Sequence, residues 1–190
     1  MARRKSSGSF LRSTKVVISI FNIRQLFFRT CFILRKKARV GGGGLREYFI
    51  YKLKDEVAER YFGKESKLFQ LFLEEYKTFT AQKDVLQKQI EYITSPLHVD
   101  PLQTFLKQML LSKKGFHTEI HSFLLESDNS SARLSFSERY LILQSVGGFE
   151  AETIIFETMR KYERCFFAMD FKYYRYGWLN PLKPRTGYGS

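Results

Sequence analysis

The chain is predicted to be a single small domain of the α+β class, in which a largely antiparallel sheet packs against several helices. Three observations lead to this prediction. One strand pattern comes first, helical apolar spacing fills the middle of the chain, and short aromatic or β-branched runs dominate the rest. The 190 residues are 44% hydrophobic and 16% aromatic, which is enough to bury a core within one domain.

The first strand is predicted at 47–53, where Glu-Tyr-Phe-Ile-Tyr-Lys-Leu combines aromatic and β-branched residues. A helix follows, with Asp55 as its N-cap and Gly63 at its end. Val57 and Tyr61 stand four positions apart in this helix. They are therefore expected to lie on one helical face.

Three more helices are predicted in the middle of the chain. Ser66 is expected to cap the first, and the other two run over 84–94 and 102–111. The helix at 84–94 has two distinct sides. One side consists of Leu86, Ile90 and Ile93, and the other of Val85, Gln89 and Tyr92.

The rest of the chain reads mostly as strands. Three are predicted, at 116–126, 132–136 and 140–146. A turn at Asp128-Asn-Ser-Ser131 separates the first two. The last predicted elements are a helix after Gly147-Gly148, a buried strand at 165–171 and an aromatic tail at 174–181.

The basic charge of the chain is concentrated at its start. The formal net charge is +13, from 32 Lys and Arg against 19 Asp and Glu. Residues 1–45 hold 11 of the basic residues and none of the acidic ones, so residues 46–190 have 21 against 19, a net charge of +2. The charge of the predicted domain therefore gives no reason to expect direct DNA binding.

Residues 1–44 form a predicted basic extension, and residues 45–190 form the predicted domain. The extension is interpreted as an amphipathic helix on an anionic membrane, an organellar transit peptide, or translated upstream DNA. We favour the last, because Gly41–Gly44 match the translation of a ribosome-binding site and Leu45 would be a TTG start codon. The alternative is a flexible glycine linker to a genuine, disordered basic arm.

No catalytic group, cofactor motif or metal site is predicted. His117 and His121 form the closest histidine pair, but on a strand they would stand about 13 Å apart, and no third ligand is evident. Cys165 begins an apolar strand and is expected to be a buried, inert thiol. The acidic residues of the last helix are expected to be solvated charges; they are Glu150, Glu152 and Glu157. We therefore do not predict an enzyme.

Tyrosine and glutamine side chains gather on two of the predicted helices. Tyr61 shares a face with Val57, while Gln89 and Tyr92 stand three positions apart on the second helix. Aromatic and amide groups on an exposed helical face are typical of a protein-binding surface. Spacing alone favours the other interpretation, in which Tyr61 and Tyr92 complete the core.

Five blocks of the chain resemble a known family. They are Arg46–Leu53, Tyr61–Ser66, Gln89–Thr94, Glu150–Glu157 and Cys165–Pro181. In this order they look like the sporulation inhibitors of replication, the SirA family of endospore-forming Bacillus relatives. The resemblance extends over about 46–184 and is weakest at about 100–145. Several blocks in the same order are a specific signal, which no single block would be.

The resemblance implies a small cytoplasmic protein that binds the N-terminal domain of the replication initiator DnaA. Such binding would keep the initiator from assembling at the origin, with one monomer in a 1:1 complex and no catalysis or cofactor. The family's contact positions fall on Val57, Tyr61 and Gln89, with Tyr92 beside them. The family pattern has phenylalanine at the position of Val57, so the contact there is expected to be weaker. The alternative function is membrane or nucleic-acid association through the basic extension.

Overall fold

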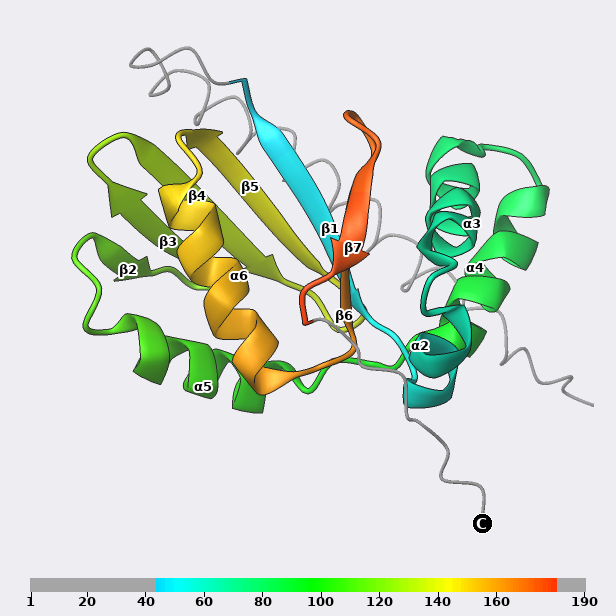
Figure 1. Ribbon diagram of the computed structural model, residues 1–190, viewed down its shortest axis with the longest axis horizontal. Coiled ribbons are helices and arrows are strands. Elements are labelled where there is room, and N and C mark those ends of the chain that lie inside the picture. Colours follow the sequence, from blue (N-terminus) through cyan, green and yellow to red (C-terminus); the bar gives the residue numbers. More distant parts are fainter. Residues whose placement is uncertain (1–43, 181–190) are drawn as a thin grey trace, which may run out of the picture. The chain divides into compact units, whose positions relative to one another are not determined.

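The computed structural model describes residues 44–180, so the predicted basic extension lies outside the described residues except for Gly44, and Pro181 also lies outside them. The described strands are β1 (Arg46–Lys52), β2 (Phe116–Thr118), β3 (Ser122–Ser127), β4 (Ser130–Phe136), β5 (Leu141–Gly147), β6 (Phe166–Asp170) and β7 (Arg175–Trp178). The described helices are α2 (Asp55–Tyr61), α3 (Glu65–Lys77), α4 (Gln82–Ile93), α5 (Val99–Leu110) and α6 (Glu150–Tyr162). Figure 1 shows their arrangement.

The seven strands form one sheet in the order β2-β3-β4-β5-β1-β6-β7, and each neighbouring pair is antiparallel. The first strand in the sequence is therefore near the middle of the sheet. Phe49 of β1 lies opposite Ile142 of β5 on one side and Met169 of β6 on the other. This architecture confirms the predicted α+β class and the largely antiparallel sheet.

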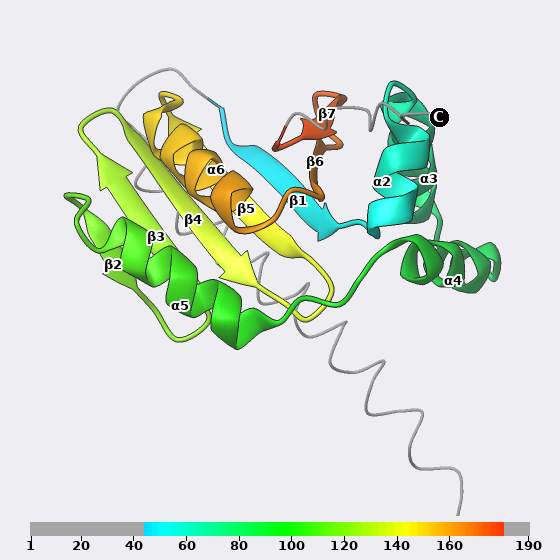
Figure 2. The same ribbon diagram turned by 60° about the horizontal axis from the view of Figure 1, so that its bottom comes forward.

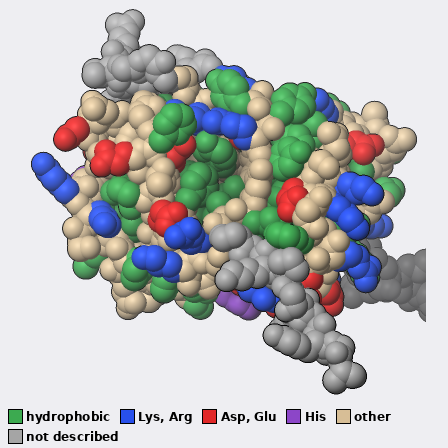
Figure 3. Space-filling view, viewed as in Figure 1, with side chains coloured by type: hydrophobic (Ala, Val, Ile, Leu, Met, Phe, Trp, Pro, Cys, Tyr) green, Lys and Arg blue, Asp and Glu red, His purple; other side chains and the backbone are tan. Residues whose placement is uncertain are grey.

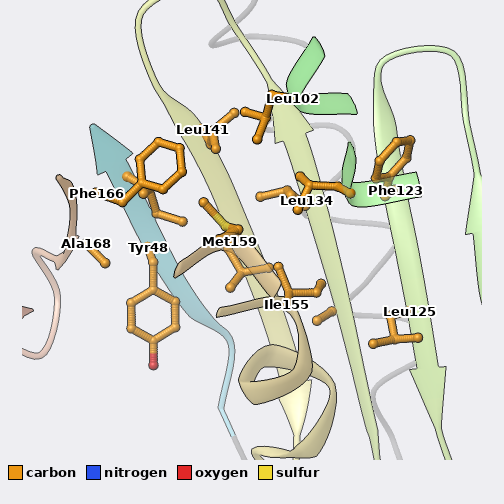
Figure 4. Close-up of a cluster of buried hydrophobic side chains, with 14 of the residues drawn as sticks. Tyr48, Leu102, Phe123, Leu125, Leu134, Leu141, Ile155, Met159, Phe166 and Ala168 are labelled. Atoms are coloured by element: carbon orange, nitrogen blue, oxygen red, sulfur yellow. The ribbon is translucent and has the colours of Figure 1, made fainter. Parts of the chain in front are cut away.

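The sheet has a separate hydrophobic core on each face, because successive side chains of a strand point to opposite faces. In β1, Tyr48 and Ile50 join one core, while Phe49 packs against the other, which also holds Leu53, the residue after the strand. We call the core that holds Tyr48 and Ile50 the upper core, and the core that holds Leu53 the lower core. The upper core, drawn in Figure 4, also holds Leu106, Leu134, Leu141, Ile155, Met159 and Phe166. The lower core also holds Leu68, Phe69, Phe72, Leu73, Ile90, Phe167, Met169 and Phe171.

The helices divide between the two cores. Figures 1 and 2 show α5 and α6 beside β2–β5, whereas α2, α3 and α4 gather near β6 and β7. Leu106 of α5 and Ile155 of α6 are fully buried in the upper core, and Phe69 of α3 and Ile90 of α4 are buried in the lower core. Within residues 44–180, the helices are all too short or too polar to cross a membrane.

A buried ion pair connects β1 to α6. Arg46 Nε donates to Glu152 Oε2 at 2.8 Å, and its two terminal nitrogens donate to the carbonyls of Gly147 and Gly148. Glu152 also accepts hydrogen bonds from the hydroxyls of Tyr48 and Ser145. Glu152 is only 4% exposed, so its prediction as a solvated charge is wrong. The prediction failed because the partner, Arg46, lies 106 positions away in the sequence.

The predicted strand at 116–126 is two strands. The chain reverses between β2 and β3, with Glu119 N donating to Ser122 O at 2.8 Å. The Ser122 hydroxyl also donates to the Glu119 carboxylate at 2.6 Å, so the two polar side chains close the turn. A strand pattern of this length does not reveal such a reversal, because the turn contains neither Gly nor Pro.

Three further details differ from the predictions. Helix α2 begins with Asp55 after an N-cap at Lys54, and α3 begins one residue before Ser66. Neither Asp55 nor Ser66 is therefore the N-cap. The predicted aromatic tail contains an edge strand, β7, in which Trp178 Nε1 donates to Glu65 Oε1 at 3.0 Å. A contact over 113 positions is outside the reach of a local pattern.

We expect Glu152→Gln to lower the free energy of unfolding by about 3 kcal/mol, because Arg46 would keep a buried charge without a counter-charge. Urea unfolding followed by circular dichroism would measure this. Glu157→Gln is the matched control, since Glu157 is on the same helix with its side chain 48% exposed. Equal stability of the two variants would contradict the structural role of the ion pair.

Candidate protein-binding site

The four predicted contact residues lie on two helices, α2 and α4, that meet at their ends. The start of α2 is held against the end of α4 by a hydrogen bond from Lys54 N to Ile93 O at 3.1 Å. Next to it, Leu53 and Thr94 form an isolated antiparallel bridge. Figure 2 shows α2 and α4 as neighbours. Because backbone hydrogen bonds fix this junction, the two helices are held in a defined arrangement.

Gln89 and Tyr92 stand on the outer side of α4. Tyr92 is 76% exposed and Gln89 is exposed, as is Val85 one turn earlier. The inner side carries the buried Leu86 and Ile90. The predicted two-sided character of α4 is therefore confirmed. The interpretation that Tyr92 completes the core is wrong.

Val57 and Tyr61 are half-buried on α2 and pack against the lower core. The interpretation that Tyr61 completes the core is therefore partly correct. The exposed part of each side chain remains open to a partner, while the buried part anchors α2 through contact with the core. A residue in this position has few free rotamers, so ordering it on binding costs little entropy.

Lys54 is a residue of this site that the sequence prediction missed. Its Nζ stands 4.9 Å from the centre of the Tyr92 ring, within the range of a cation–π contact. Such a contact at an exposed position contributes about 0.5–1 kcal/mol and favours one orientation of the ring. We refer to Lys54, Val57, Tyr61, Gln89 and Tyr92 together as the α2–α4 face.

A second group of polar side chains lies behind α2. The Cys165 thiol donates to Asp55 Oδ1 at 2.9 Å. The Glu163 carboxylate is also near, so that one possible ligand atom from each of the three residues lies within 4.8 Å of the other two. Both carboxylates already have cations, with Lys52 Nζ 2.6 Å from Glu163 and Arg164 3.4 Å from Asp55. We therefore assign no metal to this group.

The thiol and the carboxylate in this group have opposite pKa shifts. Burial, with the adjacent Asp55 carboxylate, raises the pKa of the Cys165 thiol to about 12. The hydrogen bond from that thiol, together with Arg164, lowers the pKa of Asp55. At neutral pH the thiol is protonated, which agrees with its prediction as a buried, inert group.

The histidine pair of the sequence analysis is not a ligand set in the described part of the chain. His117 lies on β2 with Nε2 4.0 Å from Glu126, and His121 lies in the exposed turn before β3. Among residues 44–180, neither belongs to a group of side chains that could hold an ion.

The fold and the α2–α4 face define the class of molecule. It is a small α+β domain in which two core-anchored helices present tyrosine and glutamine side chains to solvent. Tyrosine is enriched in protein interfaces because it combines large apolar area with a polar group. A surface of this composition is suited to binding another protein.

Comparison with known proteins gives the family. A family model described as "Sporulation inhibitor of replication protein SirA" matches residues 46–183. The protein of that name from Bacillus subtilis (strain 168) is 40% identical over 145 residues, which covers 74% of this chain and 97% of the relative. The chain belongs to the SirA family.

We expect Cys165 to resist alkylation at neutral pH in the folded protein and to react at once after unfolding in urea. The buried thiol, whose pKa is about 12, forms almost no thiolate at neutral pH. Mass spectrometry after iodoacetamide treatment measures the reaction. The chain would carry Cys31→Ser, so that one thiol remains. Rapid labelling of the folded protein would contradict the described environment of Cys165.

Proposed function

We propose that this protein inhibits the initiation of chromosome replication during sporulation by binding the N-terminal domain of the initiator DnaA. The observation that carries the proposal is the family match over residues 46–183, with a relative named as a sporulation inhibitor of replication. The proposal implies a cytoplasmic monomer that forms a 1:1 complex. It assigns the contact to Val57, Tyr61, Gln89 and Tyr92 of the α2–α4 face.

The chemistry of the α2–α4 face supports this assignment. Tyr92 offers an exposed ring with a hydroxyl at its tip, and Gln89 offers two amide donors and a carbonyl acceptor. Val57 and Tyr61 add apolar area held by the lower core. Interfaces obtain most of their binding energy from a few such well-supported anchors.

Inhibition by this route needs no reaction at the inhibitor. A folded domain seated on the initiator's N-terminal domain would occupy surface that other partners of the initiator need. The strength of inhibition would then follow the fraction of initiator bound, so it would depend on the amount of inhibitor and on its affinity. An enzyme would instead act at amounts far below those of its target.

Titration calorimetry of the full chain against the N-terminal domain of DnaA from the same organism tests the proposal. Saturable 1:1 binding is the expected result, and residues 45–190 alone should bind equally well. Absence of binding between two folded proteins would overturn the proposal. Binding that requires the basic extension and falls steeply with salt would favour the membrane or nucleic-acid alternative.

Tyr92→Ala is expected to weaken this binding by about 2 kcal/mol, because an exposed aromatic anchor would be lost without a change in the core. Phe79→Ala is the matched control, since Phe79 is 84% exposed and precedes α4 at its other end. Tyr61→Ala should weaken binding similarly, but it also needs a thermal unfolding comparison because Tyr61 packs on the lower core. Unchanged binding by the folded Tyr61→Ala and Tyr92→Ala variants would contradict the assignment of the initiator contact to the α2–α4 face.

Val57→Phe is expected to tighten the complex by about 1 kcal/mol, since phenylalanine would bury more apolar area than valine at the same position. Calorimetry with the same initiator domain measures the change. Ile120→Phe serves as the control, because Ile120 is 90% exposed in the turn between β2 and β3. If Val57→Phe folds normally and binds more weakly, the partner is matched to valine instead.

A further inference from the structure

Four cations surround the aromatic and amide side chains of the α2–α4 face: Lys54, which belongs to the face, and Arg60, Lys64 and Lys88, which lie next to it. We call these four cations the basic border. Lys54 and Arg60 flank Val57 at three positions before and after it, Lys64 follows the turn after Tyr61, and Lys88 stands one turn before Tyr92. Residues three or four positions apart in a helix are neighbours on its surface. This spacing places Arg60 beside Val57 and Lys88 beside Tyr92. Lys54 lies against the Tyr92 ring, and the amide of Lys64 donates to the carbonyl of Tyr61 at 2.8 Å. Figure 3 shows Lys and Arg side chains close together on the side of the molecule that holds α3 and α4.

The neighbouring carboxylates are mostly engaged elsewhere. Arg164 pairs with Asp55 and Glu59 on the far side of α2, and Arg139 pairs with Glu91. Glu65 accepts hydrogen bonds from Gly63 N and Trp178 Nε1. These acidic groups are therefore held in contacts within the domain.

The cations at the border have no such partners. Among the described residues, no ion pair joins a carboxylate to Lys54, Arg60, Lys64 or Lys88. Three carboxylates nearby have no described ion pair: Glu56 on α2, Asp84 on α4, and Glu65, whose hydrogen-bond donors are uncharged. Four cations against three carboxylates leave the border with a net charge of +1.

A bound partner would remove water from this border, and a cation that loses water without gaining a counter-charge opposes binding. We infer that the partner surface seated on the α2–α4 face is acidic, with carboxylates placed against Lys54, Arg60, Lys64 and Lys88. This inference rests on the proposed function and adds the chemical character of the partner's docking surface. The aromatic centre would supply most of the affinity, and the basic border would speed association and select the partner.

The test compares two double variants that change the net charge equally. Lys64→Glu/Lys88→Glu reverses two cations of the border, whereas Lys113→Glu/Lys114→Glu reverses two exposed lysines beyond α5. Stopped-flow association of each full-length protein with the DnaA N-terminal domain would be measured between about 50 mM and about 300 mM NaCl, a range over which screening becomes strong. Circular dichroism would confirm that each variant folds.

The association rate of the unchanged protein is expected to fall as salt rises. At low salt the association rate constant of the border variant should be lower by up to about tenfold, and it should depend less on salt. The rate constant of the control variant should match that of the unchanged protein. Acidic residues of the DnaA N-terminal domain would then be replaced by lysine one at a time. Some of these replacements should restore fast association of the border variant, which would identify the carboxylates that face the border.

Two results would overturn the inference while leaving the proposed function intact. One is a border variant that binds the initiator domain as fast as the unchanged protein at every salt concentration. The other is an equal loss in the border and control variants, which would show that net charge and not the border matters. Absence of binding by the unchanged protein is a separate result, because it would overturn the proposed function itself.

Discussion

Burial of β1 on both faces is the constraint on which the rest of this structure depends. The strand is near the middle of the sheet, where Ile50 is fully buried in the upper core and Phe49 packs against the lower core. A shift of one residue in its pairing would exchange these two sets of side chains. The Arg46–Glu152 ion pair opposes such a shift, because it fixes the start of β1 against α6 and the Gly147-Gly148 turn.

The position of the α2–α4 face depends on β1. Leu53, the residue after β1, is buried in the lower core. Lys54 follows it as the N-cap of α2, and its amide donates a hydrogen bond to Ile93 of α4. The helices then bury Ala58 and Ile90 beneath the face. If a partner docks on a surface attached this closely to the core, less conformational entropy is lost than on a mobile one.

The face combines two kinds of interaction with different consequences. Exposed tyrosine and glutamine side chains at its centre are suited to short-range contacts, which govern how long a complex lasts. In the proposed complex, the cations at its border would act over longer distances and raise the rate of association. The proposed inhibition by binding would benefit from both, because such an inhibitor must find a limited target and remain bound to it.

Much of this could be predicted from local sequence. The alternation in β1, the two sides of α4 and the aromatic strand β6 follow from side-chain periodicity, and the ordered blocks of the SirA family identify the family. The turn between β2 and β3 could not be predicted, because two ordinary polar side chains close it without Gly or Pro. The same limit applies to Glu152, whose charged partner Arg46 is 106 positions away in the sequence.

The sequence by itself determined the fold class, the family and four of the five residues of the α2–α4 face, all but Lys54. Tertiary structure decided which of those residues face solvent: it left Tyr92 exposed and set Tyr61 half into the lower core. It also brought Lys54 against Tyr92 and left four cations unpaired at the border within the described residues. The physical reason is that periodicity fixes the side of a helix on which a residue lies, whereas burial and ion pairing depend on what the rest of the chain places against that side.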